Sequence, residues 1–217
     1  LVGSEMCIRD RDGTLVDTAP DFKNSLNYML SEMGEDTVEL SDIRNWVGYG
    51  ARELIRRTVE AKNIKHNDKK INEMLRIFLL HYTHNIDDDS VLYNNVENFL
   101  RHLKKNNIKT SVCTNKMESL SIMLLEKLGV LNLFDYLVGG DTFKKSKPDP
   151  YPLIQICEKL NVDANDSIMV GDSITDLKAG HAANMPVVLV DYGYTDDTST
   201  YDLSLIHISE PTRRYEI

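Results

Sequence analysis

The sequence has few cysteines and no long apolar segment. Its 217 residues include three cysteines, at positions 7, 113 and 157. They are too few and too scattered for a disulfide framework or a zinc cluster, which favours a reducing compartment, so we predict a cytoplasmic protein. No run of about 18 apolar residues is present, so neither a membrane-spanning helix nor a membrane partner is predicted.

The sequence also lacks an excess of basic residues. Its 25 Lys and Arg stand against 34 Asp and Glu, which gives a formal net charge of −9. An acidic chain repels the phosphate backbone of nucleic acids, so nucleic acid is not a predicted partner. Hydrophobic residues make up 41% of the chain, which is enough for a sizeable core in a globular protein.

The two ends of the chain show no pattern typical of a folded element. Residues 1–11 have no basic segment followed by an apolar one, so they are not a signal peptide, and they are not predicted to form a strand. Residues 205–217 show neither helical nor strand periodicity. We expect both segments to be non-native ends that take no part in the fold.

Residues 19–90 follow helical spacing. The clearest case is 19–33, whose apolar side chains recur on one helix face before Gly34 ends the pattern. Further helices are predicted over 41–46, 51–60 and 68–82. This part of the chain is therefore expected to be all helix.

From residue 91 onward, helices and β-rich runs alternate. Strands are predicted at 108–113, 136–138, 168–170 and 187–190, and helices at 96–103, 118–128, 151–160 and 175–183. Repeated alternation of this kind is typical of an α/β fold, with a mostly parallel sheet and helices on both of its faces. Functional sites in such folds lie at the carboxyl ends of the strands.

The first cluster of chemically useful side chains precedes the helical part. Asp10 and Asp12 lie two residues apart before Gly13, so both carboxylates can point at one place if the extended chain then turns sharply. Such a pair suits a hard cation with oxygen ligands, or a carboxylate nucleophile beside an acid/base. Acidic residues before a glycine are also common in ordinary turns.

Two further clusters follow predicted strands or lie between them. Thr114, Asn115 and Lys116 come directly after the strand predicted at 108–113. They could hold a phosphate oxygen or begin a helix. Lys147 lies next to a proline and could be a fixed point charge or a solvated surface lysine.

The last cluster follows the strand predicted at 168–170. Asp172 lies at the strand tip and Asp176 one helical turn further on, so they either approach one point or form an acidic helix start. All four clusters would meet in one crevice if their strands belong to one parallel sheet. Carboxylates, one lysine and a hydroxyl around a cation are what phosphoryl transfer requires, since its catalysis is mostly positioning and charge neutralisation.

Taken together, these motifs resemble the haloacid dehalogenase superfamily of phosphohydrolases, and within it the phosphoglycolate phosphatase group with a helical cap. The similarity covers roughly residues 10–195. The matching segments are Asp-Arg-Asp-Gly-Thr-Leu at 10–15, Trp-Val-Gly-Tyr-Gly-Ala at 46–51, Thr-Asn-Lys at 114–116, Lys-Pro-Asp-Pro at 147–150 and Gly-Asp-Ser at 171–173. The resemblance implies a Rossmann-like, three-layer parallel-sheet core over 12–18 and 91–204, with an all-α cap inserted at 19–90.

The resemblance also implies a role for each site residue. Asp10 would attack phosphorus and form an aspartyl-phosphate, and Asp12 would act first as the acid and then as the base. Thr114 and Lys147 would hold the phosphoryl oxygens, with Asn115 also among the substrate-binding residues. The cofactor Mg²⁺ would be bound by Asp10, Asp12 through its backbone carbonyl, Asp172 and Asp176.

The chain departs from the family pattern next to the expected nucleophile. The family has apolar residues just before the nucleophile and between the two aspartates, whereas this chain has Arg9 and Arg11. The first strand of the family fold is therefore expected to be missing. No segment after residue 202 is predicted to supply the family's last strand and helix.

The cap is expected to select the substrate. Its loop at 48–52 supplies the predicted substrate contacts Gly48, Gly50 and Arg52, although a plain turn between two helices fits the same residues. Closure of the cap over the substrate would exclude bulk water.

The predicted function is a Mg²⁺-dependent phosphomonoester hydrolase whose partner is a small phosphorylated metabolite, with 2-phosphoglycolate as the first choice. A sugar phosphomutase, or a phosphatase for pyrophosphate or sugar phosphates, would use the same nucleophile. Two hypotheses in which the protein is not an enzyme also remain open. One is a phospho-acceptor of the receiver type, and the other is an inactive relative that serves as a binding module.

Overall fold

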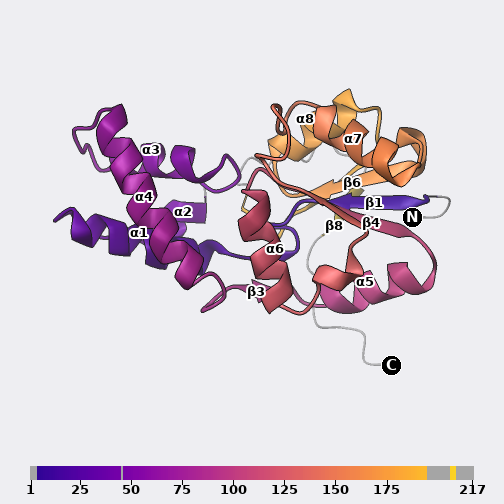
Figure 1. Ribbon diagram of the computed structural model, residues 1–217, viewed down its shortest axis with the longest axis horizontal. Coiled ribbons are helices and arrows are strands. Elements are labelled where there is room, and N and C mark those ends of the chain that lie inside the picture. Colours follow the sequence, from indigo (N-terminus) through magenta and orange to yellow (C-terminus); the bar gives the residue numbers. More distant parts are fainter. Residues whose placement is uncertain (1–3, 45, 195–205, 209–217) are drawn as a thin grey trace.

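The computed structural model describes residues 4–44, 46–194 and 206–208 of the chain. Figure 1 shows a bundle of helices beside a sheet that has helices on both faces. The helices of the bundle are α1 (Ala19–Glu32), α2 (Leu40–Arg44), α3 (Ala51–Ala61) and α4 (Asp68–His84). No helix in the described part of the chain is long and apolar enough to cross a membrane.

The sheet is parallel and has six strands. The strands are β1 (Met6–Arg9), β4 (Lys109–Cys113), β5 (Tyr136–Val138), β6 (Ser167–Gly171), β7 (Val187–Val190) and β8 (Ile206–Ile208). Their spatial order is β5-β4-β1-β6-β7-β8. The helical connections are α5 (Val96–Lys105), α6 (Glu118–Lys127), α7 (Tyr151–Leu160) and α8 (Ile174–Ala182), with short 3₁₀ turns at Leu131–Leu133 and Ala164–Asp166. These elements agree with the predicted alternation.

The side chains of β1 alternate between the two faces of the sheet. Ile8 packs with Leu153 of α7 and Leu177 of α8, whereas Cys7 packs on the opposite face with Leu103 of α5. Helices thus cover both faces, as Figure 1 shows. The predicted α/β fold with three layers is confirmed.

The expectation that residues 1–11 contain no strand is wrong. Strand β1 lies in the middle of the sheet, between β4 and β6. Its side chains from Met6 to Ile8 are buried, and the guanidinium of Arg9 lies 4.6 Å from the ring centroid of Phe99. A cation over an aromatic ring is stabilised by the electrons of the ring face, so this arginine is compatible with a central strand.

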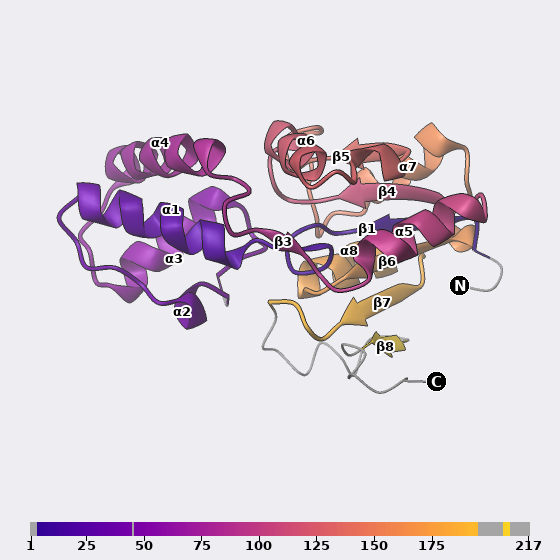
Figure 2. The same cartoon turned by 90° about the horizontal axis from the view of Figure 1, so that it is seen from below.

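The expectation that residues 205–217 form no strand is also wrong for part of that segment. Ile206–Ile208 form β8, which pairs with β7 at the edge of the sheet (Figure 2). A sheet edge presents unpaired backbone N–H and C=O groups, so a short segment can pair there through its main chain without a periodic sequence. The prediction that no last helix follows residue 202 falls on residues 195–205 and 209–217, which lie outside the described residues.

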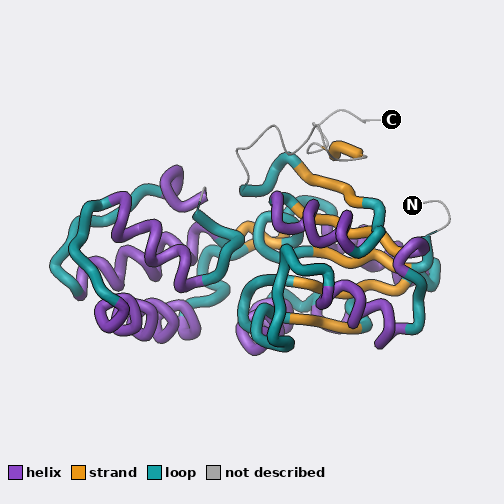
Figure 3. The backbone as a smooth tube through the Cα atoms, turned by 90° about the horizontal axis from the view of Figure 1, so that it is seen from above, coloured by secondary structure: helices purple, strands orange, loops and turns teal. Residues whose placement is uncertain are grey.

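Two short strands that the sequence analysis did not predict join the helical bundle to the sheet. They are β2 (Val16–Asp17) and β3 (Val91–Leu92), and they pair antiparallel. The chain leaves the sheet before α1 and returns after α4, and Figure 3 shows the helices of the bundle apart from the strands. We therefore propose that 19–90 form a cap and that the core contains 12–18 and 91–194 together with β1, which the predicted boundary at residue 12 had left out.

Candidate active site

Asp10 follows β1 directly, in the middle of the sheet. Its backbone N–H donates a hydrogen bond of 2.9 Å to the carbonyl of Val170 in β6. Its Oδ1 accepts a hydrogen bond of 2.8 Å from the N–H of Arg11. Asp10 is 6% exposed. The sheet therefore fixes the backbone of Asp10, and the next peptide unit helps to fix its carboxylate.

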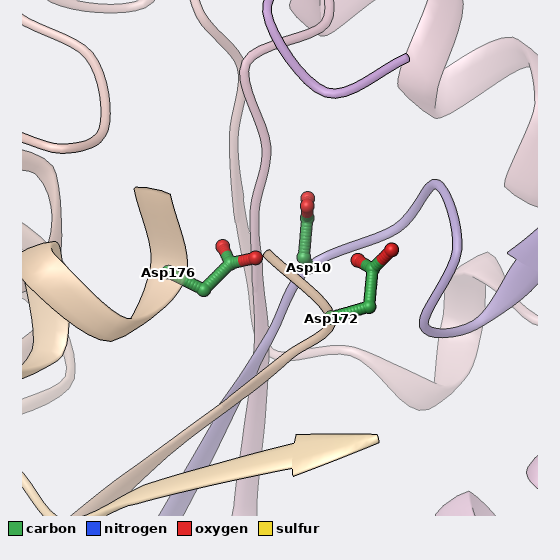
Figure 4. A group of neighbouring side chains, drawn as sticks. All are labelled: Asp10, Asp172 and Asp176. Atoms are coloured by element: carbon green, nitrogen blue, oxygen red, sulfur yellow. The ribbon is translucent and has the colours of Figure 1, made fainter. Parts of the chain in front are cut away.

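Two more carboxylates come from the neighbouring strand and helix. Asp172 follows β6, and Asp176 lies in the first turn of α8. One carboxylate oxygen from each of Asp10, Asp172 and Asp176 lies within 4.8 Å of the others, and all three residues are buried. Figure 4 shows that the three side chains are neighbours. We call these three residues the acidic cluster, and its position at the carboxyl ends of the strands is the one expected for a site in an α/β fold.

Lys147 supplies a positive charge to the acidic cluster. Its Nζ lies 3.1 Å from Oδ1 of Asp10 and 2.5 Å from Oδ1 of Asp176. Burial opposes the charge on Lys147, but Asp10 and Asp176 raise its pKa above the ordinary value. Lys147 is therefore held as a fixed cation between two carboxylates.

The remaining carboxylate oxygens of the cluster accept hydrogen bonds from nearby loops. Asp172 accepts one of 3.1 Å from the hydroxyl of Thr14 and one of 2.8 Å from the N–H of Tyr194. Asp176 accepts one of 2.5 Å from the hydroxyl of Ser173 and one of 3.1 Å from its N–H. These bonds fix the direction in which each carboxylate points.

The turn after Asp12 requires the glycine at position 13. The φ angle of Gly13 is +80°, in the left-handed region that glycine adopts without strain. A Cβ atom at this position would lie 2.1 Å from Oδ2 of Asp172. Gly13 therefore allows the first acidic motif to approach the last one.

The acidic cluster carries more negative charge than Lys147 offsets. Burial raises the pKa of Asp10 to about 6, although Lys147 opposes this effect. Burial and the nearby carboxylates of Asp176 and Asp10 raise the pKa of Asp172 well above its ordinary value. A divalent cation would offset the surplus charge, and carboxylate oxygens are ligands that Mg²⁺ prefers. The donor set therefore fits a Mg²⁺ site.

Asp12 lies beside the acidic cluster but has different partners. Its Oδ1 is bonded to the guanidinium of Arg11 and accepts a hydrogen bond of 2.8 Å from the hydroxyl of Thr18. Burial alone would raise the pKa of Asp12, but Arg11 and then Lys116 hold it below the ordinary value. Asp12 is thus stabilised as a carboxylate.

The loop after β4 connects the core to the cap. The N–H of Thr114 donates a hydrogen bond of 3.0 Å to the carbonyl of Val138 in β5. The side-chain amide of Asn115 donates to the carbonyl of Lys147 at 3.0 Å and to that of Gly48 at 3.3 Å. Asn115 thereby links the Lys147 loop to the cap loop.

A cavity lies between the core and the cap, and its volume is about 620 Å³ with the open mouth included. The core lines it with Asp10, Asp12, Thr114, Asn115, Lys116, Met117 and Leu120, and the cap with Phe22, Val47, Gly48, Gly50, Ala51, Leu54, Phe78, Leu79 and Tyr82. The structure therefore places Gly48 and Gly50 at the cavity. It places Arg52 elsewhere, since this side chain is exposed and is bonded to the Asn72 side chain of α4.

Tyr194 was not among the predicted site residues, and its hydroxyl lies where the cap begins. This hydroxyl accepts hydrogen bonds of 2.5 Å from the N–H of Thr18 and 3.0 Å from that of Ala19, and it donates one of 2.9 Å to Asp17. No local pattern could reveal this contact, because Tyr194 follows β7 far along the chain. Thr14 was also missed, although its place directly after Asp-Gly could have indicated it.

The chain is similar to known proteins over most of its length. The haloacid dehalogenase-like hydrolase family matches residues 7–190. A phosphoglycolate phosphatase of Mesorhizobium japonicum is 40% identical over 187 residues, which cover 86% of this chain and 82% of the relative. A phosphoglycolate phosphatase of Colwellia psychrerythraea is 39% identical over 93% of this chain and 91% of its own length.

Solved structures show the same relationship. The crystal structure of a predicted phosphoglycolate phosphatase from Haemophilus somnus has a TM-score of 0.89 and 28% identity, and the match covers 94% of each chain. A β-phosphoglucomutase from Clostridium difficile has a TM-score of 0.76 and 23% identity over 94% of this chain and 90% of its own, so it supports the fold alone. The fold and the site define a hydrolase of the phosphatase type. The chain belongs to the haloacid dehalogenase-like hydrolase family, which confirms the predicted family and enzyme class.

Proposed function

We propose that this chain is a Mg²⁺-dependent phosphomonoesterase that hydrolyses 2-phosphoglycolate or a closely similar small phosphate. The observation that carries the proposal is the acidic cluster with Lys147 in contact with two of its three carboxylates. The relatives named phosphoglycolate phosphatase support the choice of substrate.

Each site residue has a distinct part in this proposal. Mg²⁺ would be held by Asp10, Asp172 and Asp176 with the backbone carbonyl of Asp12. When bound, it would offset negative charge and polarise the phosphoryl group. Thr114 and Lys147 would hold the phosphoryl oxygens. We assign Asn115 to positioning these loops, because its amide already donates to two carbonyl groups.

The reaction would take place in two steps. In the first, a carboxylate oxygen of Asp10 attacks phosphorus, the bond from phosphorus to the ester oxygen breaks, and Asp12 gives a proton to the leaving alkoxide. In the second, Asp12 takes a proton from water as the water oxygen attacks the aspartyl-phosphate. The products are the alcohol, inorganic phosphate and the Asp10 carboxylate.

Phosphate release from 2-phosphoglycolate tests the proposal. We expect turnover that requires Mg²⁺ and is abolished by EDTA, and a loss of at least about 10³-fold in Asp10→Asn because the nucleophile is removed. The matched control is Asp88→Asn, which changes an exposed carboxylate and should keep full activity.

Three outcomes would contradict parts of the proposal. Equal turnover by the wild type and Asp10→Asn would exclude Asp10 as the nucleophile. Full activity in EDTA would exclude the metal. Turnover of sugar phosphates or pyrophosphate with 2-phosphoglycolate left intact would replace the substrate and leave the chemistry unchanged.

A further inference from the structure

Lys116 lies on the cavity wall and has no role in the two steps above. It lines the same cavity as Asp10. Its Nζ donates a hydrogen bond to the hydroxyl of Tyr82 and lies 3.8 Å from the ring centroid of Tyr82 and 4.4 Å from that of Phe22. Contacts between an ammonium and aromatic faces are attractive, so the cap holds this lysine in place.

Lys116 differs from the other cations near the site because it has no carboxylate partner. Lys147 pairs with two members of the acidic cluster, and Arg11 pairs with Asp12. Lys116 forms no ion pair with any of the residues that the structure describes. Burial lowers its pKa well below the ordinary value, and Arg11 adds to this effect. Asp12 and Asp21 oppose this effect from a distance, but no carboxylate among the described residues lies within ion-pair distance of Lys116.

Arg11 adds a second positive charge near Lys116. It is fully buried, and its Nε and Nη1 have no hydrogen-bond partner among the described residues. Arg11 is paired with Asp12. The next carboxylate, Asp21, accepts hydrogen bonds from the backbone N–H groups of Asp89 and Ser90 and does not line the cavity. Among the described residues, Lys116 is therefore a cation at the cavity with no carboxylate in contact, whereas the acidic cluster has a surplus of negative charge.

A cation without a contacting carboxylate on one side and the acidic cluster on the other suit a substrate with two different anionic ends. A phosphoryl group would bind where Mg²⁺ offsets the charge of the acidic cluster. A second anion would be attracted to Lys116, because opposite charges attract strongly in a cavity with little water. The nearby walls at Phe22, Phe78 and Leu120 are apolar and offer no other charge for it.

We infer that Lys116 binds the carboxylate of the substrate and so selects small phosphomonoesters that carry a carboxylate close to the ester. This inference rests on the proposed function and adds a specificity-determining residue to it. Arg11 contributes a second positive charge near Lys116 and would attract the same carboxylate.

The test compares two substrates that differ in one end. These are 2-phosphoglycolate and 2-hydroxyethyl phosphate, which has a hydroxymethyl group in place of the carboxylate. In Lys116→Met we expect kcat/KM for 2-phosphoglycolate to fall about 10- to 100-fold, as for loss of a hydrogen bond between charged groups. For 2-hydroxyethyl phosphate we expect a fall below about threefold, since that substrate never had the bond. Lys116→Arg should keep most of the preference.

Two controls separate this role from others. Lys159 also lies over an aromatic ring, with Nζ 6.0 Å from the centroid of Tyr136, but not at the cavity, so Lys159→Met should leave both substrates unaffected. Inhibition by inorganic phosphate should be unchanged in Lys116→Met, because phosphate occupies only the phosphoryl end. Should Lys116→Met fail to fold, Lys116→Gln, which keeps a donor for Tyr82, replaces it in the same comparison.

Each result decides the inference. A fall for 2-phosphoglycolate alone supports it. An equal fall for both substrates, weaker inhibition by inorganic phosphate, or a wild type that shows no preference would overturn it while the phosphatase chemistry stands. A wild type that releases phosphate from neither substrate would overturn the proposed function, and the inference with it.

Discussion

The two walls of the cavity are built from different kinds of residue. On the core side, the wall carries the charged side chains of the cavity, Asp10, Asp12 and Lys116, with Met117 and Leu120 beside them. On the cap side, it carries apolar and aromatic side chains, with glycines and the hydroxyl of Tyr82. This difference indicates that the sheet determines the chemistry and that the cap determines the shape around the rest of the substrate.

The two walls should therefore respond differently to substitution. The charged groups of the core are buried and bonded to one another, so a change there should affect both stability and chemistry. A change on the cap wall should affect which substrate is accepted. A change on the outer face of the cap should affect neither.

The largest effect is expected for Lys147→Met, on the core side. This substitution leaves the carboxylates of Asp10 and Asp176 buried without their cation. Breaking a buried ion pair by removing one partner costs about 3–5 kcal/mol. We expect a loss of unfolding free energy of this order in urea titrations without Mg²⁺, and a loss of phosphate release of at least about 10²-fold. Added Mg²⁺ should restore part of the stability.

An exposed lysine of the same loop provides the control for this experiment. Lys145 pairs with Asp149 at 2.9 Å, and its side chain is 60% exposed. Exposed pairs of this kind contribute about 0–1 kcal/mol, so Lys145→Met should unfold like the wild type. Equal stability of the two variants would show that Lys147 does not compensate the acidic cluster.

The stability of the protein should also depend on pH, because Asp10 of the core wall has a raised pKa. The pKa of Asp10 is raised from 3.8 to about 6 in the folded protein, so the folded state binds this proton more tightly than the unfolded state does. Protonation of Asp10 therefore stabilises the folded state at low pH, and this stabilisation is lost as the pH rises from about 4 through about 6. Without Mg²⁺, we expect the wild type to lose about 1–2 kcal/mol relative to Asp10→Asn between pH 5 and pH 8.

Urea unfolding of both proteins at the two pH values measures this difference. With Mg²⁺ present, the loss should shrink, because the cation favours the ionised carboxylate. A difference between the wild type and Asp10→Asn that is the same at both pH values would mean that Asp10 has an ordinary pKa.

Most of the fold could be predicted because its elements follow simple periodic patterns. The helix predicted at 19–33 is α1, and the strand predicted at 136–138 is β5. Strand β1 could not be predicted because Arg9 and Arg11 interrupt an apolar run. Arg9 is buried against the ring of Phe99, and Arg11 is buried in an ion pair with Asp12. A local sequence pattern does not reveal such partners.

The site was partly predictable for a similar reason. Asp172 and Asp176 follow a predicted strand, and the resemblance to the family implied that Asp10 and Lys147 join them. The structure brings all four together. The contacts of Tyr194 depend on how the loop after β7 returns to the beginning of the cap. That return is a property of the tertiary structure and has no local signal.

Arg11 is bonded to Asp12 of the core wall, and its removal should change the preference among leaving groups. Arg11 stabilises Asp12 as a carboxylate, whereas the first step of the proposed reaction needs its proton. In Arg11→Leu, kcat/KM for ethyl phosphate should rise about 10-fold relative to that for p-nitrophenyl phosphate, whose leaving group needs no proton. Because kcat/KM reports the steps up to the first irreversible one, the comparison isolates the transfer to Asp10.

The matched control for this prediction is Arg9→Leu. Arg9 is also a buried arginine, but it packs on Phe99 away from the cavity. Its removal should leave the ratio of the two substrates unchanged. The same ratio in both variants would mean that Arg11 does not influence the proton of Asp12.

The smallest effect is expected for Arg52→Ala, on the outer face of the cap. Arg52 is exposed and bonded to Asn72, whereas Leu54 of the same helix is 3% exposed and lines the cavity. We expect KM for 2-phosphoglycolate to change less than about twofold in Arg52→Ala, as for an ordinary surface substitution, and severalfold in Leu54→Ala. An increase in KM of about tenfold or more in Arg52→Ala would mean that the cap supplies a charge to the substrate. In that case the contrast between a charged core wall and an apolar cap wall would no longer hold.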